Sequence, residues 1–240
     1  MLLGSNRSPS VSLASLLNHH NTANLQVDRN SLTGQATDLL REQIIGGRIP
    51  PGTKLIEREV AELLGISRMP AREALMNLER EGLVVAKNSG RYVIQPTQTD
   101  IEHLYQVRLL LECLAVELAA SHATPEFCRA LQANLQQMRD AIARNDRAAY
   151  VRSDLEAHQL IWAQAGNPHL QKMLHSITGP IFLFIATHTE FQTDWTETLQ
   201  LHEELADAIC AGNPKQAAQS MREQLENSLQ LSLRVFRNPS

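Results

Sequence analysis

Two arginines, Arg68 and Arg72, stand four positions apart in the sequence. On a helix this spacing places both guanidinium groups on one face, where each can bind a phosphate or donate to guanine O6 and N7. Ser67 precedes them, and the free N–H groups at a helix start suit a phosphate oxygen. The alternative is a solvated face on which Arg72 pairs with Glu73 or Glu79. We expect DNA contacts, because the adjacent residues Arg72 and Glu73 point apart.

A second group of residues could bind a metal ion. Asp154 and His158 are also four positions apart, so that a carboxylate and an imidazole share one helix face, and His202 follows on a later predicted helix. Carboxylate oxygen and imidazole nitrogen are common ligands of divalent transition metals. An Asp-x-x-x-His pair alone is more often a surface feature, so the pattern leaves both interpretations open.

The arginines must be positioned by short elements in the first part of the chain. Apolar periodicity and glycine or proline breaks predict three helices and then a small hairpin. The helices cover 35–45, 57–64 and 67–80, and the hairpin strands cover 83–86 and 91–94. This order is typical of a winged helix-turn-helix, whose second motif helix lies in the major groove of DNA. The candidate DNA-binding residues are Arg58, Ser67, Arg68, Arg72, Lys87, Asn88, Gly90 and Arg91.

The remainder of the chain predicts only helices. They lie near 101–122, 125–144, 146–165, 168–190, 195–211 and 214–236. One of them carries an apolar stripe of Leu104, Val107, Leu111, Leu114 and Leu118. The fold class is therefore mainly α, with an N-terminal winged helix-turn-helix and a C-terminal all-α bundle of six or seven helices around a cavity. We divide the chain into a flexible arm (1–30), a DNA-binding unit (31–96) and a helical unit (97–240).

Composition excludes several classes of protein. The chain has 240 residues, a net charge of −4 and 43% hydrophobic residues, which is an ordinary globular balance. Residues 34–96 carry nine Lys and Arg against eight Asp and Glu, while residues 97–240 carry eleven against seventeen. No apolar run is long enough to span a membrane, and the first residues do not resemble a secretory signal. We therefore expect a cytoplasmic protein, without a membrane partner, in which Cys113, Cys128 and Cys210 are reduced thiols.

The run from Leu55 to Leu83 resembles the DNA-binding domain of the GntR family of bacterial transcription regulators, within a similarity that covers about 34–96. The order Ser-Arg-x-Pro-x-Arg-Glu-Ala-Leu, which begins at Ser67, is specific. The resemblance implies that four residues contact the operator, namely Arg58, Arg68, Arg72 and Gly90. Met69 departs from the pattern, because the family often has threonine at this position. The resemblance therefore implies that this chain lacks one possible hydroxyl contact with a phosphate.

Residues 100–236 resemble the FCD type of effector domain, named after the C-terminal domain of a fatty-acid-responsive regulator. The similarity lies in the segment 107–112, in Asp154 and His158, in Gly166-Asn167 and around His202. Many such domains bind a divalent metal through one aspartate and three histidines. The metal helps to hold a small carboxylate effector, and an arginine at the position of Arg108 completes the clamp.

The last expected histidine is absent, because position 224 is Gln224. A carboxamide is a poorer ligand for Zn²⁺ or Ni²⁺ than an imidazole. Asp154, His158 and His202 could still hold Zn²⁺, Ni²⁺ or Mn²⁺, with water or effector at the open positions. Alternatively, the site is free of metal and Gln224 binds the effector directly.

These patterns predict a homodimeric, ligand-responsive transcription regulator that binds a palindromic operator and is not an enzyme. One alternative is a metal-dependent enzyme that uses Asp154, His158 and His202, although no general base or nucleophile accompanies them. A purely structural helical protein would leave the two arginines without a role. We expect the other histidines to be ordinary, and only His188 is a further candidate for the cavity.

Overall fold

The computed structural model describes residues 32–188 and 195–237, so the predicted arm over 1–30 lies outside the described residues. Its elements follow one another along the chain as α2 (Leu32–Ile45), β1 (Lys54–Leu55), α3 (Glu57–Leu64), α4 (Arg68–Arg80), β2 (Val84–Lys87), β3 (Gly90–Val93), α5 (Gln98–Ser121), α6 (Pro125–Ala143), α7 (Arg147–Gln164), α8 (Pro168–Thr187), α9 (Trp195–Cys210) and α10 (Pro214–Arg237). The predicted fold class is confirmed, and the helix bounds agree with the sequence pattern to within a few residues.

The N-terminal unit is a winged helix-turn-helix whose apolar faces point inward. Ala36, Leu40, Leu75 and Leu78 are almost fully buried between α2 and α4. Gly65 ends α3 in the left-handed conformation (φ 63°), which glycine adopts without steric cost. The chain can therefore turn sharply into α4.

The wing is a sheet of three strands and not a simple hairpin. Its order is β1-β3-β2, with antiparallel pairs on both sides of β3. The pairing sets Lys54 opposite Tyr92 and Lys87 opposite Gly90. The sequence did not predict β1, because two residues after a Pro-Pro-Gly turn carry no alternation that could be recognised.

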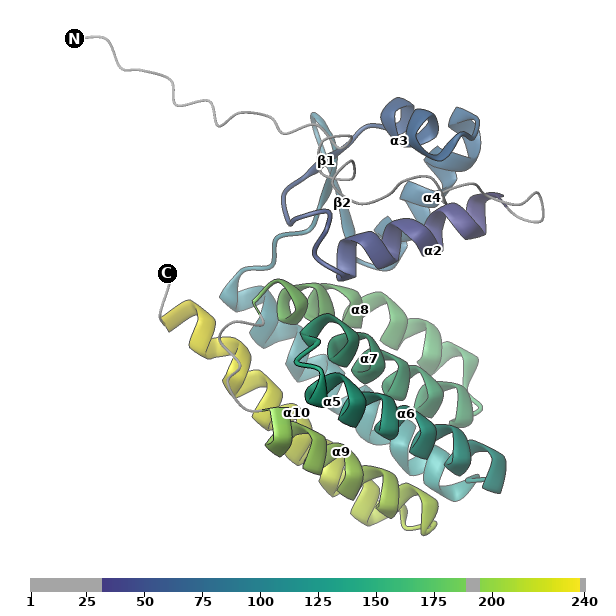
Figure 1. Ribbon diagram of the computed structural model, residues 1–240, viewed down its shortest axis with the longest axis vertical. Helices are drawn as coiled ribbons and strands as arrows, with labels where there is room; N and C mark the ends of the chain where they lie inside the picture. The colour runs from purple at the N-terminus through teal and green to yellow at the C-terminus, as the bar shows by residue number, and fades with distance from the viewer. Residues whose placement is uncertain (1–31, 189–194, 238–240) are drawn as a thin grey trace.

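The C-terminal unit is a bundle formed by α5–α10 (Figure 1). Short polar side chains start its helices, as Thr124, Asp146 and Asn167 each accept a backbone N–H from the first turn. Within the bundle, α10 packs along α5, and α6 packs along α7. No described helix is both long and apolar enough to cross a bilayer.

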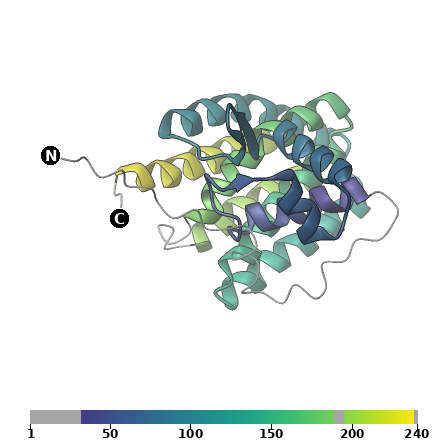
Figure 2. The ribbon, with the colours of Figure 1, turned by 90° about the horizontal axis from the view of Figure 1, so that it is seen from above.

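The two units meet where α8 packs against α2 and the turn after α4 (Figures 1 and 2). Phe182 and Leu183 of α8 are fully buried in the core of the N-terminal unit. Two glycines allow this approach, since a Cβ on Gly82 or on Gly179 would lie only 2.8 Å from a carbonyl oxygen of the opposite unit. The contact is therefore close-packed.

One predicted apolar stripe lies only partly against the core, because Leu104, Leu111 and Leu118 pack there while the other two residues are exposed. Val107 and Leu114 of α5 are 46% and 42% exposed, and the neighbouring Leu110 is 72% exposed. The buried face of α5 instead carries Arg108 and Glu112 among small and apolar residues. Periodicity alone could not identify the inner face, because apolar residues surround most of this helix.

The structure contradicts the expectation of three reduced cysteines, since it contains two of them in oxidised form. Cys128 and Cys210 form a disulfide, with their Cα atoms 5.8 Å apart, and only Cys113 is a free and buried thiol. The two residues are 82 positions apart in sequence. Sequence reasoning missed the pair because only the packing of α6 against α9 brings its members together.

Candidate functional site

A concave surface lies between the start of α4 and the tip of the wing. It brings together most of the predicted DNA-binding residues, namely Arg58, Arg68, Lys87, Asn88, Gly90 and Arg91. Ser67 is exposed at the N-cap of α4, and its hydroxyl makes no capping hydrogen bond there. The exposed start of a helix and a hairpin tip that carries basic residues are thus presented on one side of the molecule.

Arg72 and Arg91 have acidic neighbours on this surface. Arg91 is 21% exposed and contacts Glu57 at 2.7 Å and Glu79 at 3.2 Å. Arg72 is 60% exposed and lies 3.9 Å from Glu57, not against Glu73 or Glu79 as in the alternative pairing. Arg72 is therefore available to a partner, whereas Arg91 fixes the wing against α3 and α4.

Lys54 is a basic residue of this surface that sequence reasoning missed. It stands on β1, and its Nζ lies over the ring of Tyr92, 5.9 Å from the centroid. Lys87 approaches the same ring at 5.4 Å. A tyrosine between two lysines keeps both ammonium groups near the wing. Only the pairing of β1 with β3 reveals this arrangement.

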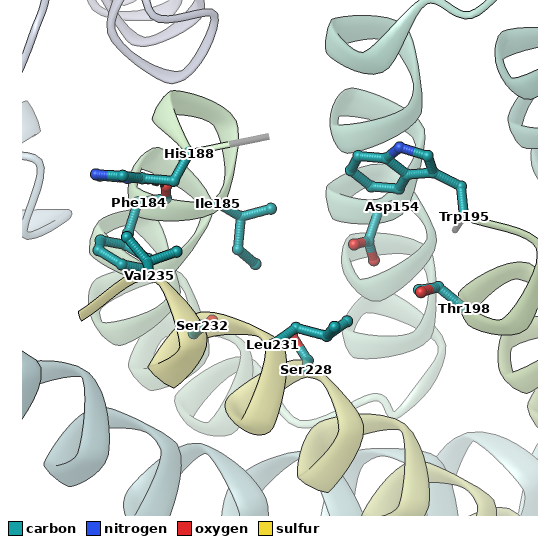
Figure 3. Close-up of a pocket in the computed structure, with 10 residues that line it drawn as sticks. All are labelled: Asp154, Phe184, Ile185, His188, Trp195, Thr198, Ser228, Leu231, Ser232 and Val235. Carbon is teal, nitrogen blue, oxygen red and sulfur yellow. Dashed lines mark hydrogen bonds between the residues drawn. The ribbon is translucent and has the colours of Figure 1, made fainter. Parts of the chain in front are cut away.

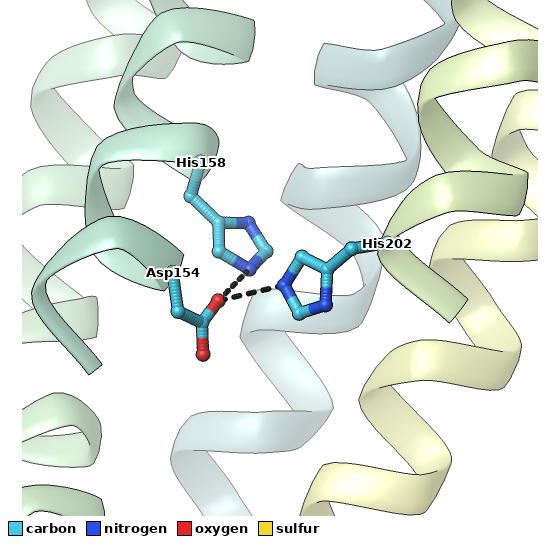
Figure 4. Close-up of side chains that lie close together, drawn as sticks. All are labelled: Asp154, His158 and His202. Carbon is cyan, nitrogen blue, oxygen red and sulfur yellow. Dashed lines mark hydrogen bonds and ion pairs between the residues drawn. The ribbon is translucent and has the colours of Figure 1, made fainter. Parts of the chain in front are cut away.

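Asp154, His158 and His202 converge inside the bundle (Figure 4). Their ligand atoms lie within 4.8 Å of one another, the only such group of three among the described residues. Asp154 Oδ1 is 2.9 Å from His202 Nε2 and 3.5 Å from His158 Nε2. Two helices, α7 and α9, therefore bring the three predicted ligands to one point.

Both histidine rings are held so that Nε2 faces this point. His158 Nδ1 lies 3.0 Å from Glu112 Oε1, and His202 Nδ1 lies 2.8 Å from the carbonyl oxygen of Thr198. The contact of His202 is a hydrogen bond of the kind that sets the tautomer and orientation of metal-binding histidines, whereas the contact of His158 with Glu112 lies at ion-pair distance without hydrogen-bond geometry. Trp162 Nε1 also donates to Glu112, at 2.7 Å.

Arg108 and Gln224 face the same point from α5 and α10. The Arg108 guanidinium is 3.0 Å from His158 Nε2, and Gln224 Nε2 is 2.9 Å from His202 Nε2. Gln224 Oε1 is buried and makes no hydrogen bond to any described residue. A flip of this amide would present an oxygen to the same point. The residues thus fit a metal with three strong ligands and one amide ligand.

Neighbouring charges shift the pKa values of the ionisable groups in the site. Burial alone would raise the pKa of the Asp154 carboxyl, but His202 and His158 beside it hold that pKa below its usual value. Burial opposes the charge of His202 as well, yet Asp154 raises the pKa of the imidazole. Burial would also raise the pKa of Glu112, and here His158 and Arg108 lower it. The carboxylates are therefore ionised ligands or counter-ions.

A cavity opens beside Asp154 (Figure 3). Its lining combines apolar side chains with hydroxyls: Asp154, Phe184, Ile185, His188, Trp195, Thr198, Ser228, Leu231, Ser232 and Val235. His188, which the sequence analysis named as a further candidate for the cavity, is one of these lining residues. Close by, the Tyr150 hydroxyl and the Trp195 indole N–H are buried without a hydrogen-bond partner among the described residues. Burial raises the pKa of Tyr150, so its hydroxyl keeps a proton to donate.

Comparison with known protein families identifies both units. The profile of the FCD domain matches residues 103–227, and that of the bacterial regulatory proteins of the gntR family matches residues 32–94. The chain belongs to the GntR family. The resemblance that the sequence motifs indicated is thus confirmed.

Individual relatives of this GntR-family chain support the same assignment. The uncharacterized HTH-type transcriptional regulator YdhC of Bacillus subtilis is 31% identical over 144 residues, which cover 59% of this chain and 64% of YdhC. The HTH-type transcriptional repressor RspR of Escherichia coli is 35% identical over 124 residues, 51% of this chain and 54% of RspR. The chain thus spans between half and two thirds of the length of these relatives.

The fold agrees with that of a solved structure. Escherichia coli McbR/YncC superposes with a TM-score of 0.77 at 23% identity, over 87% of this chain and 100% of McbR/YncC. Because the GntR and FCD families contain regulators, the alternative of a metal-dependent enzyme at Asp154, His158 and His202 is not supported.

Proposed function

We propose that the protein is a ligand-responsive DNA-binding transcription regulator of the cytoplasm. Residues 31–96 bind the operator, and residues 97–240 bind a small effector and form the dimer. The observation that carries the proposal is the surface on which Arg58, Arg68 and Lys87 surround the exposed start of α4. Donors arranged in this way suit the base edges and phosphates of a major groove.

On DNA, α4 enters the major groove with its first turn. Arg68 and Arg72 reach guanine edges or phosphates, and Ser67 with the free N–H groups of the helix start binds a phosphate oxygen. Arg58 contacts the backbone from α3. Lys87, Asn88 and Gly90 at the tip of the wing approach the adjacent minor groove, and Arg91 holds the wing in place.

In the helical unit, Asp154, His158 and His202 hold a divalent metal such as Zn²⁺, Ni²⁺ or Mn²⁺, with Gln224 beside it. A bound metal would supply a positive charge that favours an anionic ligand. Arg108 adds a second positive charge, so a small carboxylate in the neighbouring cavity is the effector class that fits best. Without a metal, Gln224 and Arg108 bind this effector directly.

The protein acts as a homodimer that joins along α5. Val107, Leu110 and Leu114 form an exposed apolar surface on this helix, which a second copy would cover. Two copies related by a twofold axis place two recognition helices on a palindromic site. An effector that favours one dimer arrangement then shifts DNA binding.

DNA binding is tested by fluorescence anisotropy over a salt series, with DNA from upstream of the gene and with random DNA. The wild type should bind its site selectively and with a steep salt dependence. Arg68→Ala and Arg72→Ala should each cost about 1–3 kcal/mol of specific binding if the arginine contacts a base. Arg129→Ala, an exposed arginine on α6, is the matched control and should bind as the wild type does. Unchanged affinity in both recognition-helix variants would refute the assignment.

A further inference from the structure

Cys128 and Cys210 form a disulfide in a bundle that already has an extensive apolar core. Cys128 lies in the first turn of α6 and Cys210 is the last residue of α9. The bundle has a continuous apolar core of its own, and the seam between α6 and α9 also has the Arg139–Glu203 ion pair at 2.7 Å. Domains of this size are stable without crosslinks. The disulfide is therefore not explained as a structural necessity.

Both cysteines of the pair are half-buried, so a small oxidant or reductant can reach them. The third cysteine differs, because Cys113 is buried and its Sγ donates to the carbonyl oxygen of Ala218 at 3.6 Å. Burial raises the pKa of the Cys113 thiol, which disfavours the reactive thiolate. The chain thus contains one accessible pair and one protected cysteine.

The pair fastens the helix that carries part of the ligand site. Cys210 follows His202 by eight residues on α9, about 12 Å along the helix axis. The other end of α9 supplies Trp195 and Thr198 to the cavity wall. A covalent link between Cys210 and α6 restrains the movement of α9 relative to the site.

We propose that Cys128 and Cys210 are a reversible thiol-oxidation site that takes hydroperoxides as oxidant and restrains α9. In a reducing bacterial cytoplasm, disulfides are rare and mostly transient, so a regulator that acts on DNA would carry this pair as dithiol until an oxidant appears. The redox state of the pair would then add a second input to the effector site.

The chemistry balances with two thiols and one peroxide. The Cys128 thiolate, near the N-terminus of α6, attacks the terminal oxygen of the hydroperoxide and the O–O bond breaks. The leaving hydroxide of hydrogen peroxide takes a proton from solvent to form water, and the alkoxide of an organic hydroperoxide forms an alcohol in the same way. The Cys210 sulfur then attacks the Cys128 sulfenic acid, the S–O bond breaks, and the second oxygen leaves as water. Both sulfurs are oxidised and the peroxide is reduced. A dithiol reductant reverses the reaction by thiol–disulfide exchange.

The test treats the reduced full-length protein with hydrogen peroxide and maps its thiols by mass spectrometry of non-reduced peptides. Two of the three free thiols should disappear as the Cys128–Cys210 disulfide forms, and Cys113 should stay reduced. Dithiothreitol should restore all three thiols. Amide hydrogen exchange at the C-terminal end of α9 should slow by about tenfold on oxidation. The melting temperature should rise by about 5 °C or more.

Cys113→Ser is the matched control and should respond to oxidation as the wild type does. In Cys128→Ser and Cys210→Ser, oxidation should neither slow the hydrogen exchange of α9 nor raise the melting temperature. The comparison of oxidised with reduced wild type remains decisive if a variant does not fold. Over-oxidation of a single cysteine without a Cys128–Cys210 link would overturn the proposal. So would equal hydrogen exchange of α9 in the two redox states. Neither measurement requires DNA or an effector.

Discussion

At the residue scale, Glu112 is the centre of a fully buried polar network. Its carboxylate contacts Arg108 at 3.1 Å, His158 at 3.0 Å and Trp162 at 2.7 Å. Glu112→Gln keeps the shape of the side chain but removes the ion-pair partner of the buried Arg108 charge. The free energy of unfolding should fall by about 3–5 kcal/mol, the cost of breaking a buried ion pair from one side. Urea denaturation followed by far-UV circular dichroism measures it.

An exposed ion pair supplies the control for that substitution. Glu126 and Arg129 on α6 are 2.8 Å apart but more than two-thirds exposed, so Glu126→Gln should change the stability by less than about 1 kcal/mol. Equal, small losses of stability in the two variants would show that the Glu112 charge does not stabilise the buried network.

Gln224 is the residue that we expect to limit the metal affinity of the proposed site. Gln224→His should bring a third imidazole next to His202 and raise the affinity for Zn²⁺ by at least about tenfold, since imidazole is the better ligand. Competition with a chromophoric chelator measures this affinity. Gln219→His, at an exposed position of the same helix, should leave it unchanged. Equal affinities of the wild type and Gln224→His would place position 224 outside the ligand set.

At the scale of elements, the helical unit begins with a capping box at the start of α5. Thr97 accepts the backbone N–H of Asp100, and the Asp100 carboxylate accepts the backbone N–H of Thr97. Thr97→Ala should cost about 1 kcal/mol of stability, as is usual for the loss of an N-cap. Chemical denaturation checks this value against Thr99→Ala, an exposed residue of the same turn that should cost less. Equal losses would mean that the cap does not stabilise α5.

The sequence predicts an element well when nearby residues determine it, and poorly when contacts with distant residues determine it. Helix ends with local chemistry, such as Gly65 or Thr124, were predicted within a few residues. The strand β1 was missed because its only support is the pairing with β3. In the site, spacing predicted Asp154 and His158, whereas Glu112 was not among the predicted site residues. Its role depends on burial and on contacts with another helix, which no local pattern encodes.

At the scale of the whole molecule, the apolar surface of α5 has no covering element within one described chain. Leu110 is 72% exposed, and Val107 and Leu114 flank it on the same face. If this surface joins two copies, Leu110→Glu would bury two charges at the twofold axis and separate the dimer. Sedimentation velocity should then show a monomer, whereas Met173→Glu, on the exposed side of α8, should stay dimeric.

The same variant links assembly to DNA binding. A dimer places two winged units on one palindrome, so the second contact forms at a high effective concentration. A monomeric Leu110→Glu protein should therefore bind the full palindrome no more tightly than a half-site, at least about tenfold more weakly than the wild type. Anisotropy on full-site and half-site DNA measures the difference. A monomer that still preferred the full palindrome would show that the winged units associate on DNA through another surface.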